Sequence, residues 1–358
     1  MMKPLEQSLA RALENLSRLV EIPSYSRQEE GTADYIGSHL ASRGIKAFRV
    51  RNNVWAANRY FEAGKPTILL CSHHDTVRPA SGYTRDPHAA ALENGKLYGL
   101  GSNDAGAPLV ALIEAFASFY DKENLRYNLI LAAVAEEECS GENGIAALLP
   151  EIPVPDCAIV GEPTGMRMAV AEKSLIVVDC TAHGRSGHAA REEGDNAIYK
   201  AVKDIEAIAG YEFPRVSEML GKVKMTVTMV NAGTQHNVIP DKCTFTVDIR
   251  TTDAYTNDQV MDTLRGLISS DAVPRSLKRR ASSIPMDHPL VRAGLELGLE
   301  PFGSPTLSDQ ALLSCPSLKI GPGESARSHT ADEYVEVAEL ERGIRIYGEL
   351  LEKLLLPG

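Results

Sequence analysis

Three short apolar runs of the sequence end, within a residue or two, in His, Asp or Glu, and a fourth run leads toward a histidine. The runs are residues 67–72, 128–135, 157–161 and 317–321, and the polar residues that follow them are His73, His74 and Asp75; Glu136, Glu137 and Glu138; Glu162; and His329. Asp104 adds a further carboxylate in the glycine-rich stretch 99–106. His, Asp and Glu without Cys form the ligand set of a catalytic zinc or cobalt centre, because structural zinc sites favour thiolates.

Each of these segments alone has a simpler interpretation, which is a polar loop at the end of a strand. Their combination in one chain is harder to explain in that way. Three consecutive glutamates at the end of a buried strand are especially costly unless cations meet them, because unpaired buried carboxylates are strongly disfavoured. We therefore expect the segments to form one metal site.

A layered α/β domain would bring such remote segments together. The apolar runs alternate with helical patterns, such as residues 106–120 with Pro108 in the first turn, and this alternation is typical of α/β layers. Ligand groups in open α/β sheets collect beyond the carboxyl ends of the strands, so one crevice is expected to hold all the segments. Two helices are predicted within the first 43 residues, the second opened by a capping box of Ser26 and Glu29 and closed by Gly44.

A second domain is expected between residues 174 and 284, where the pattern of elements changes. A strand from 174, a helix from 195 to about 209, two strands within 224–249, a helix capped by Thr256 and Gln259, and a last strand in 272–284 follow the β-α-β-β-α-β order of a ferredoxin-like α+β unit. The main domain is then discontinuous, with residues 1–173 and 285–358 on either side of the insert 174–284. A length of 358 residues, against about 150 per domain, by itself favours two domains or one large one.

Composition restricts the partners and the location of the chain. Lys and Arg number 37 and Asp and Glu 48, and a net charge of −11 repels phosphate backbones and anionic lipids, so neither nucleic acid nor a membrane surface is expected as a partner. The apolar runs are far shorter than the ~20 residues of a membrane span. No export signal is visible at the charged N-terminus, so the cytoplasm is the expected location. The six scattered cysteines are expected to be reduced thiols.

Five motifs together resemble those of the dinuclear metal deacylases and peptidases that include acetylornithine deacetylase, succinyl-diaminopimelate desuccinylase and aminoacylase. The matching segments, in the family's order, are His73-His74-Asp75, Gly99 to Gly106, Glu136-Glu137-Glu138 with Asn143-Gly144, Gly161 to Thr164, and Ser328-His329-Thr330. The resemblance covers nearly the whole chain. It implies a zinc-exopeptidase-like α/β fold, with a central, mostly parallel sheet and helices on both faces, and an inserted dimerisation domain.

The resemblance also implies a role for each residue of the site. His73 and Glu162 are expected to hold one metal ion, Glu138 and His329 the other, and Asp104 to bridge both; zinc is the first choice, and cobalt or manganese also suit these ligands. Asp75 would orient His73, which agrees with their spacing, because residues two apart in an extended segment point to one side. His74 then faces away and has a structural role. Glu137, beside Glu138, is the expected general base. Ala105-Gly106-Ala107 departs from the Met-Lys-Gly of many relatives.

The insert carries segments that resemble the family's substrate-binding motifs. His188 matches the histidine that stabilises the oxyanion, and the family's homodimer implies that His188 serves the metal centre of the other subunit. Asn237 and Arg250 lie in segments that resemble those binding the substrate carboxylate and carbonyl, and Gly321 is a further candidate contact. A guanidinium grips both carboxylate oxygens, so Arg250 suits a carboxylate clamp. An ion pair of Arg250 with Asp248 or Asp253 is the alternative.

The resemblance implies hydrolysis of an N-acyl-L-amino acid, with N-acetyl-L-ornithine or N-acetylcitrulline deacetylation in arginine biosynthesis as the first choice. Succinyl-diaminopimelate desuccinylase or a metallo-dipeptidase on the same centre is the alternative. A non-enzymatic binding protein on this fold would need a broken ligand set, and here all five ligands and the base are present. The segment 307–310 precedes a buried strand and is a candidate contact for the substrate's side chain. Its composition does not distinguish the ammonium group of ornithine from the neutral ureido group of citrulline.

Overall fold

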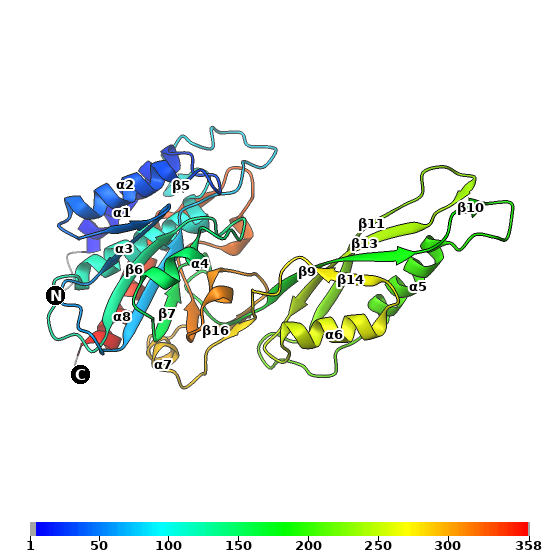
Figure 1. The fold of residues 1–358 in the computed structure, drawn as a ribbon. Helices are drawn as coiled ribbons and strands as arrows, with labels where there is room; N and C mark the ends of the chain where they lie inside the picture. The colour runs from blue at the N-terminus through cyan, green and yellow to red at the C-terminus, as the bar shows by residue number, and fades with distance from the viewer. Residues whose placement is uncertain (1–4, 357–358) are drawn as a thin grey trace. The chain divides into compact units, whose positions relative to one another are not determined.

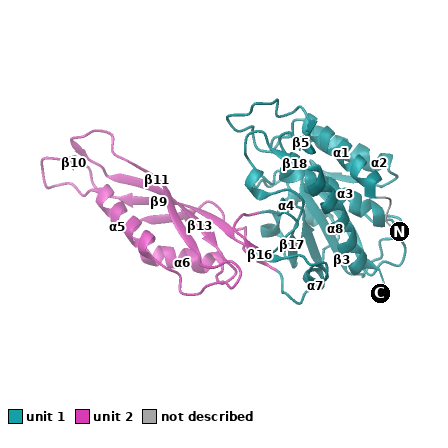
Figure 2. Ribbon diagram, turned by 180° about the vertical axis from the view of Figure 1, so that it is seen from behind, with its two compact units in different colours: residues 1–170, 284–302, 308–358 teal, residues 171–283, 303–307 magenta. Residues whose placement is uncertain are grey.

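The computed structural model describes residues 5–356, and the chain forms two compact units (Figure 2). The first unit comprises residues 1–170, 284–302 and 308–358, and the second comprises 171–283 and 303–307. The boundaries at 170 and 284 lie close to those predicted at 173 and 285. The short segment 303–307, which we expected in the main domain, groups instead with the second unit.

Figure 1 shows the elements of the first unit and of its boundaries and labels some of them. In chain order they are α1 (Leu5–Glu21), α2 (Glu30–Ser42), β1 (Phe48–Val50), β2 (Asn53–Ala57), β3 (Thr67–His73), β4 (Ala91–Glu93), β5 (Lys96–Tyr98), the short turn η1 (Ser102–Gly106), α3 (Ala107–Phe119), β6 (Asn128–Val134), α4 (Ile145–Leu148), η2 (Leu149–Glu151), β7 (Cys157–Val160), β8 (Met168–Glu172), α7 (Pro289–Glu296), β16 (Pro301–Ser304), η3 (Asp309–Leu312), β17 (Ser317–Lys319), η4 (Ser325–Arg327), β18 (Tyr334–Glu336) and α8 (Val337–Leu355).

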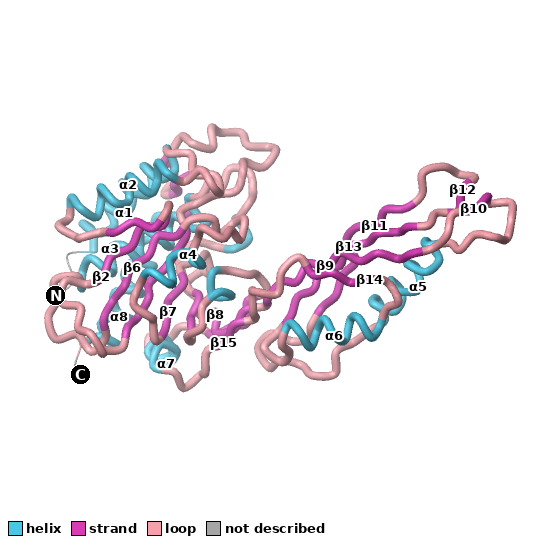
Figure 3. The backbone as a smooth tube through the Cα atoms, in the orientation of Figure 1, coloured by secondary structure: helices cyan, strands magenta, loops and turns pink. Residues whose placement is uncertain are grey.

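The large sheet runs in the order β1-β2-β6-β3-β7-β17-β8-β15, with β16 also paired to β8 (Figure 3). Its four central strands, β6, β3, β7 and β17, are parallel, whereas the outer pairs are antiparallel. The side chains of β3 and β6 are buried throughout, which is typical of parallel strands covered on both faces. The predicted α/β fold with a mostly parallel sheet is therefore confirmed.

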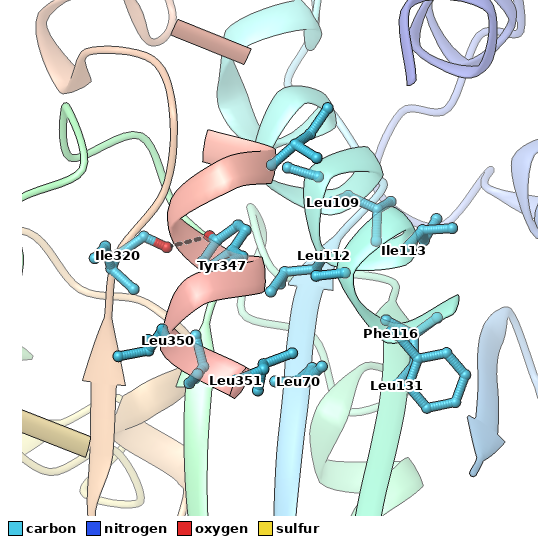
Figure 4. Packing of buried hydrophobic residues seen from close by; sticks show 14 of the residues in the cluster. Leu70, Leu109, Leu112, Ile113, Phe116, Leu131, Ile320, Tyr347, Leu350 and Leu351 are labelled. Atoms are coloured by element: carbon cyan, nitrogen blue, oxygen red, sulfur yellow. Dashed lines mark hydrogen bonds between the residues drawn. The ribbon is translucent and has the colours of Figure 1, made fainter. Parts of the chain in front are cut away.

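The two faces of this sheet hold separate hydrophobic clusters. Successive residues of β3 point to opposite faces, so Ile68 and Leu70 pack in one cluster and Leu69 and Cys71 in the other. The first cluster includes residues of α1, α2, α3, α7 and α8, and Figure 4 shows α3 and α8 packed on this face, where the buried Tyr347 hydroxyl donates to the backbone oxygen of Ile320. The second cluster includes residues of the short helix α4.

The second unit has the predicted ferredoxin-like order. Its elements are β9 (Ser174–His183), β10 (Gly187–His188), α5 (Ala197–Gly210), β11 (Lys224–Ala232), β12 (Val238–Ile239), β13 (Lys242–Thr251), α6 (Asn257–Leu267), β14 (Asp271–Pro274) and β15 (Ser282–Ser283). The sheet order is β11-β13-β9-β14 with every neighbouring pair antiparallel. The capping box of Thr256 and Gln259 at α6 is confirmed. The last strand occupies 271–274, which is shorter than the range 272–284 that we expected to contain it.

The predicted capping box of Ser26 and Glu29 is wrong. Glu29 directly precedes α2 but no side chain caps the helix there. The Ser26 hydroxyl instead donates to Asp75 at 2.7 Å, and the Glu29 carboxylate accepts the backbone N–H of Glu136 at 3.3 Å. Both side chains are thus used by loops that follow strands of the sheet. Gly44 does follow the end of α2 with a positive φ of 73°, as predicted.

Two further expectations concern the chain as a whole. None of the helices within residues 5–356 is long and apolar enough to cross a membrane. All six cysteines are unbridged, as predicted, and four of them are buried.

Candidate metal centre

The central strands bring three of the predicted segments to one edge of the sheet. His73 is the last residue of β3, and its register partner Val134 is the last residue of β6, so Glu136–Glu138 begin two residues beyond the level of His73. Cys71 pairs with Val160 at the end of β7, and Glu162 follows two residues later. Parallel strands end at the same edge, which explains why segments so distant in the sequence meet here.

His73 lies between two carboxylates. Its Nε2 atom is 3.2 Å from Oδ1 of Asp104 and 3.8 Å from Oε1 of Glu162. Its Nδ1 atom is 3.0 Å from the backbone oxygen of Asp75. A carbonyl oxygen only accepts, so Nδ1 carries the hydrogen and the lone pair of a neutral imidazole is on Nε2, facing the two carboxylates. This is the orientation of an imidazole that binds a metal through Nε2.

His329 forms the matching half of the site. Its Nε2 atom is 3.0 and 2.9 Å from the two oxygens of Glu138 and 3.7 Å from Oδ2 of Asp104. The two carboxylate oxygens of Asp104 therefore face different histidines, Oδ1 toward His73 and Oδ2 toward His329. A carboxylate held in this way has the geometry of a bridge between two cation positions.

The three consecutive glutamates occupy different environments. Glu136 has a positive φ of 55°, and its buried carboxylate accepts the side-chain and backbone N–H groups of Asn143 at 2.8 and 3.2 Å. The backbone N–H groups of Glu137 and Glu138 donate to the Asp75 carboxylate at 3.0 and 3.2 Å. Glu136 thus closes its own turn, whereas Glu137 and Glu138 face the site.

Glu137 lies close to both expected ligands of one metal ion. Donor atoms of His73, Glu137 and Glu162 all lie within 4.8 Å of one another, as do those of His73, Asp104 and Glu138. The geometry thus places Glu137, which we expect to be a base, also within reach of a cation at this position.

The electrostatics of the cluster favour a cation. Burial raises the pKa of Glu137 well above its ordinary value, and burial, opposed by the charge of His73, raises the pKa of Glu162 to about 8. The hydrogen bond to Glu138 raises the pKa of His329 to about 9. Buried carboxylates that resist ionisation and an imidazole that favours its charged form both indicate a shortage of positive charge. The oxygen and imidazole donors fit a divalent ion such as zinc, cobalt or manganese.

The turn that carries Asp104 is shaped by a glycine and by a glutamate that the sequence analysis missed. Gly101 has a φ of 76°, and a Cβ atom there would lie 2.5 Å from Cγ2 of Thr76, so only glycine fits. The buried Glu333 carboxylate accepts three backbone N–H groups of the turn, from Gly101, Asn103 and Asp104. Burial and the charge of Asp104 raise the pKa of Glu333 to about 8. Its position four residues after His329 was the signal available in the sequence.

His74 has the structural role that we expected. Its ring is buried, Nδ1 lies 2.8 Å from the hydroxyl of Thr32, and Nε2 lies 2.9 Å from the backbone oxygen of Asn52. Burial lowers the pKa of His74 to about 4, so the ring is neutral.

The predicted substrate-binding residues are distributed over both units. His188 and Asn237 come together in the second unit, where β10 pairs with β12 and the Ala189 N–H donates to the Asn237 backbone oxygen at 3.0 Å. Arg250, also in the second unit, forms two hydrogen bonds to Asp248, at 2.9 and 3.2 Å, which is the alternative that we considered for it. Gly321, in the first unit, is buried, and its N–H donates to the Thr164 hydroxyl at 3.1 Å.

The fold and the donor cluster define a metal-dependent hydrolase, and comparison with known proteins identifies its family. Residues 69–353 match the family described as peptidase family M20/M25/M40, and the chain belongs to this family. It is a metal-dependent amidohydrolase, as predicted.

Relatives of known name include both deacylases. The chain is 29% identical to a succinyl-diaminopimelate desuccinylase of Corynebacterium glutamicum over 90% of this chain and 91% of the relative. It is 28% identical to an acetylornithine deacetylase of Proteus mirabilis over 82% of this chain and 81% of the relative. These identities do not separate the two substrates.

Solved structures share the fold. An aminopeptidase of Bacillus cereus superposes with a TM-score of 0.77 at 21% identity, covering 97% of this chain and 98% of its own. A dinuclear metal-binding peptidase of Bacillus subtilis superposes with a TM-score of 0.73 at 17% identity, with the same coverage. The similarity extends over nearly the whole of each chain.

Proposed function

We propose that the chain hydrolyses the amide bond of an N-acyl-L-amino acid, with N-acetyl-L-ornithine or N-acetylcitrulline as the substrate, at a centre of two divalent ions. The observation that carries this proposal is the position of Asp104 between two pairs, each made of one histidine and one glutamate. His73 and Glu162 would hold one ion, Glu138 and His329 the other, and Asp104 both. When bound, such ions polarise an amide carbonyl and acidify a water nucleophile.

Glu137 is the proposed base. It lies against the same cluster, and burial raises the pKa of its carboxylate. Two bound cations would oppose that shift and favour the ionised form, which can take a proton from the attacking water. The same carboxylate then passes this proton to the leaving amine. The assignment requires that Glu137 is not itself a ligand.

His188 is the proposed donor to the oxyanion. Its Nδ1 atom accepts the backbone N–H of Ala190 at 3.1 Å, so a neutral ring carries its hydrogen on Nε2. A side-chain N–H held in this tautomer is suited to stabilise the negative oxygen of a tetrahedral intermediate.

The active form is proposed to be a homodimer that pairs through the insert, with His188 of one subunit serving the metal centre of the other. Two features of the second unit support the pairing. β11 is an edge strand of its sheet, and Met229 and Val230 on it are more than half exposed. An edge strand offers backbone groups for pairing with another chain.

The roles of Arg250, Asn237 and Gly321 in substrate binding remain proposals. Arg250 pairs with Asp248 in this structure, so it can bind a substrate carboxylate only if the substrate displaces Asp248. The place of the reaction in arginine biosynthesis and in the cytoplasm likewise stays a prediction.

The second candidate activity is succinyl-diaminopimelate desuccinylation, which is favoured by the relative at 29% identity. Hydrolysis of matched N-acetyl and N-succinyl derivatives of ornithine, citrulline, diaminopimelate and methionine, together with a dipeptide, distinguishes the candidates. We expect the highest kcat/KM for N-acetylornithine or N-acetylcitrulline, because ratios of kcat/KM report differential binding of the transition state. Preference for N-succinyl-diaminopimelate or for the dipeptide would replace the proposed substrate.

A further inference from the structure

We propose that Glu333 is a positioning residue that fixes Asp104 relative to His329 and thereby sets the affinity of the metal centre. This inference rests on the proposed roles of Asp104 and His329 as ligands. It assigns a function to a buried carboxylate, 2% exposed, whose hydrogen bonds go to the backbone of the Asp104 turn.

The carboxylate of Glu333 binds the backbone of the Asp104 turn directly. Oε1 accepts the N–H groups of Asn103 and Asp104, both at 2.9 Å, and Oε2 accepts the N–H of Gly101 at 3.0 Å. The backbone oxygen of Glu333 accepts the N–H of Gly99 at 2.9 Å. One residue therefore satisfies four N–H groups of a six-residue stretch in which regular secondary structure is interrupted at Asp104.

A second tether joins the same two segments from the other side. The Asn103 side chain accepts the N–H of Glu324 at 2.9 Å and donates to the Glu324 backbone oxygen at 3.1 Å. The segment from Glu324 to Glu333, which contains His329, is thus bound to the Asp104 turn at both of its ends. These two tethers join the segments in which Asp104 Oδ2 and His329 Nε2 lie 3.7 Å apart.

Only a carboxylate meets all three donors. A carboxylate offers acceptors on both oxygens, whereas a glutamine amide has one oxygen and one NH2 group that cannot accept. In either orientation, Glu333→Gln directs that NH2 group at one or more backbone N–H donors of the turn. A buried N–H that loses its acceptor is costly, so the turn is expected to shift. Asp104 would move with it.

The consequence is measurable in metal binding itself. Replacing groups that orient metal ligands typically costs about 10–100-fold in metal affinity or activity. We therefore expect Glu333→Gln to weaken binding of at least one of two Co²⁺ equivalents by about 10–100-fold and to change the Co²⁺ absorption spectrum.

Asp332→Asn is a matched control. The adjacent Asp332 carboxylate also accepts backbone N–H groups, but those of Thr84 and Arg85, outside the Asp104 turn. Asn tolerates the positive φ of 54° at this position. Asp332→Asn should bind both equivalents with the affinity of the unchanged protein.

The experiment titrates the metal-stripped full-length protein and both variants with Co²⁺, following the absorption spectrum and the bound equivalents, and records thermal unfolding of each metal-free protein. Weaker Co²⁺ binding by Glu333→Gln, with Asp332→Asn unaffected, supports the inference. A lower Tm of Glu333→Gln with both Co²⁺ affinities and the spectrum unchanged would reduce Glu333 to a purely structural role and overturn it.

The experiment distinguishes a failure of this inference from a variant that does not fold and from a failure of the proposed metal centre. If Glu333→Gln does not fold, Asn103→Ala, which cuts the second tether and leaves Glu333, must weaken Co²⁺ binding, and unchanged binding overturns the inference. If the unchanged protein does not bind two equivalents, the proposed function fails, and the inference that rests on it fails too. Two equivalents in the unchanged protein with no effect in the variants would overturn the inference alone.

Discussion

The carboxylate of Asp75 accepts the backbone N–H of Glu137 at 3.0 Å, and its other oxygen accepts the N–H of Glu138 at 3.2 Å. The Ser26 hydroxyl donates to the same carboxylate, and the backbone oxygen of Asp75 accepts from His73. Asp75 thus fixes the orientation of an imidazole and the register of the glutamates at the same time. The positions of these two backbone N–H groups determine which glutamate is the proposed base, Glu137, and which is the proposed ligand, Glu138.

Glu137→Gln tests this division of roles. The amide cannot take a proton from water, so we expect turnover to fall by about 10²–10⁴-fold while both metal equivalents remain bound. Glu142→Gln, at an exposed position in the same loop, is the matched control and should retain full activity. Activity and bound metal are measured on the same samples. Loss of metal from Glu137→Gln would show that Glu137 is a ligand and that the roles assigned to the consecutive glutamates are wrong.

Asp104→Ala and His329→Ala test the bridge. The two oxygens of Asp104 face different histidines. We therefore expect Asp104→Ala to weaken the binding of both metal ions and His329→Ala to weaken mainly the binding of one. Metal analysis after equilibrium dialysis counts the bound equivalents in each variant. Loss of one and the same equivalent in both variants would indicate a mononuclear centre.

Subunit mixing tests whether His188 acts across a dimer. His188→Ala is expected to lower kcat by about 10²–10³-fold, the effect of removing an oxyanion donor, with little change in bound metal. Mixed dimers of His188→Ala and Glu137→Gln contain one site with both residues intact, so activity should return when the two inactive proteins exchange subunits. Absence of recovery after verified exchange would contradict action in trans.

Gly101→Ala tests the backbone of the Asp104 turn. Alanine at a φ of 76° pays about 1–2 kcal/mol of backbone strain, and its Cβ would also lie 2.5 Å from Cγ2 of Thr76. Gly44→Ala is the matched control, since Gly44 has a φ of 73° but nothing within 4 Å of the added Cβ. Thermal unfolding should show a larger loss of Tm for Gly101→Ala than for Gly44→Ala. The difference should correspond to roughly 1–3 kcal/mol of unfolding free energy, the cost of overpacking against Thr76. Equal losses would show that the turn accommodates the methyl group.

The sequence was sufficient to predict the α/β fold because its parallel strands are short apolar runs with polar residues at their ends. The convergence of His73 and Glu162 follows from the adjacency of β3 and β7 in a parallel sheet. The ferredoxin-like order of the second unit was equally readable from alternating patterns and from the Thr256 cap.

Hydrogen bonds between residues that are remote in the sequence could not be predicted from local patterns. Ser26 and Glu29 fit a local capping pattern, but Asp75 and the N–H of Glu136, both remote in the sequence, bind them instead. Glu333 is marked in the sequence only by its position four residues after His329, because its hydrogen-bond partners lie some 230 positions earlier in the chain. A single sequence shows which groups can form hydrogen bonds but not which remote backbone atoms meet them.

The most direct test of the two-metal hydrolase is metal reconstitution followed by both binding and hydrolysis. Metal-stripped protein is titrated with Zn²⁺ or Co²⁺, and the bound equivalents and the free amine released from N-acetyl-L-ornithine and the other acyl amino acids are measured at each step. The account predicts no hydrolysis without metal, and hydrolysis that rises as up to two equivalents bind. Full hydrolysis by the metal-free protein, or binding of two equivalents without hydrolysis of any amide in the panel, would contradict it.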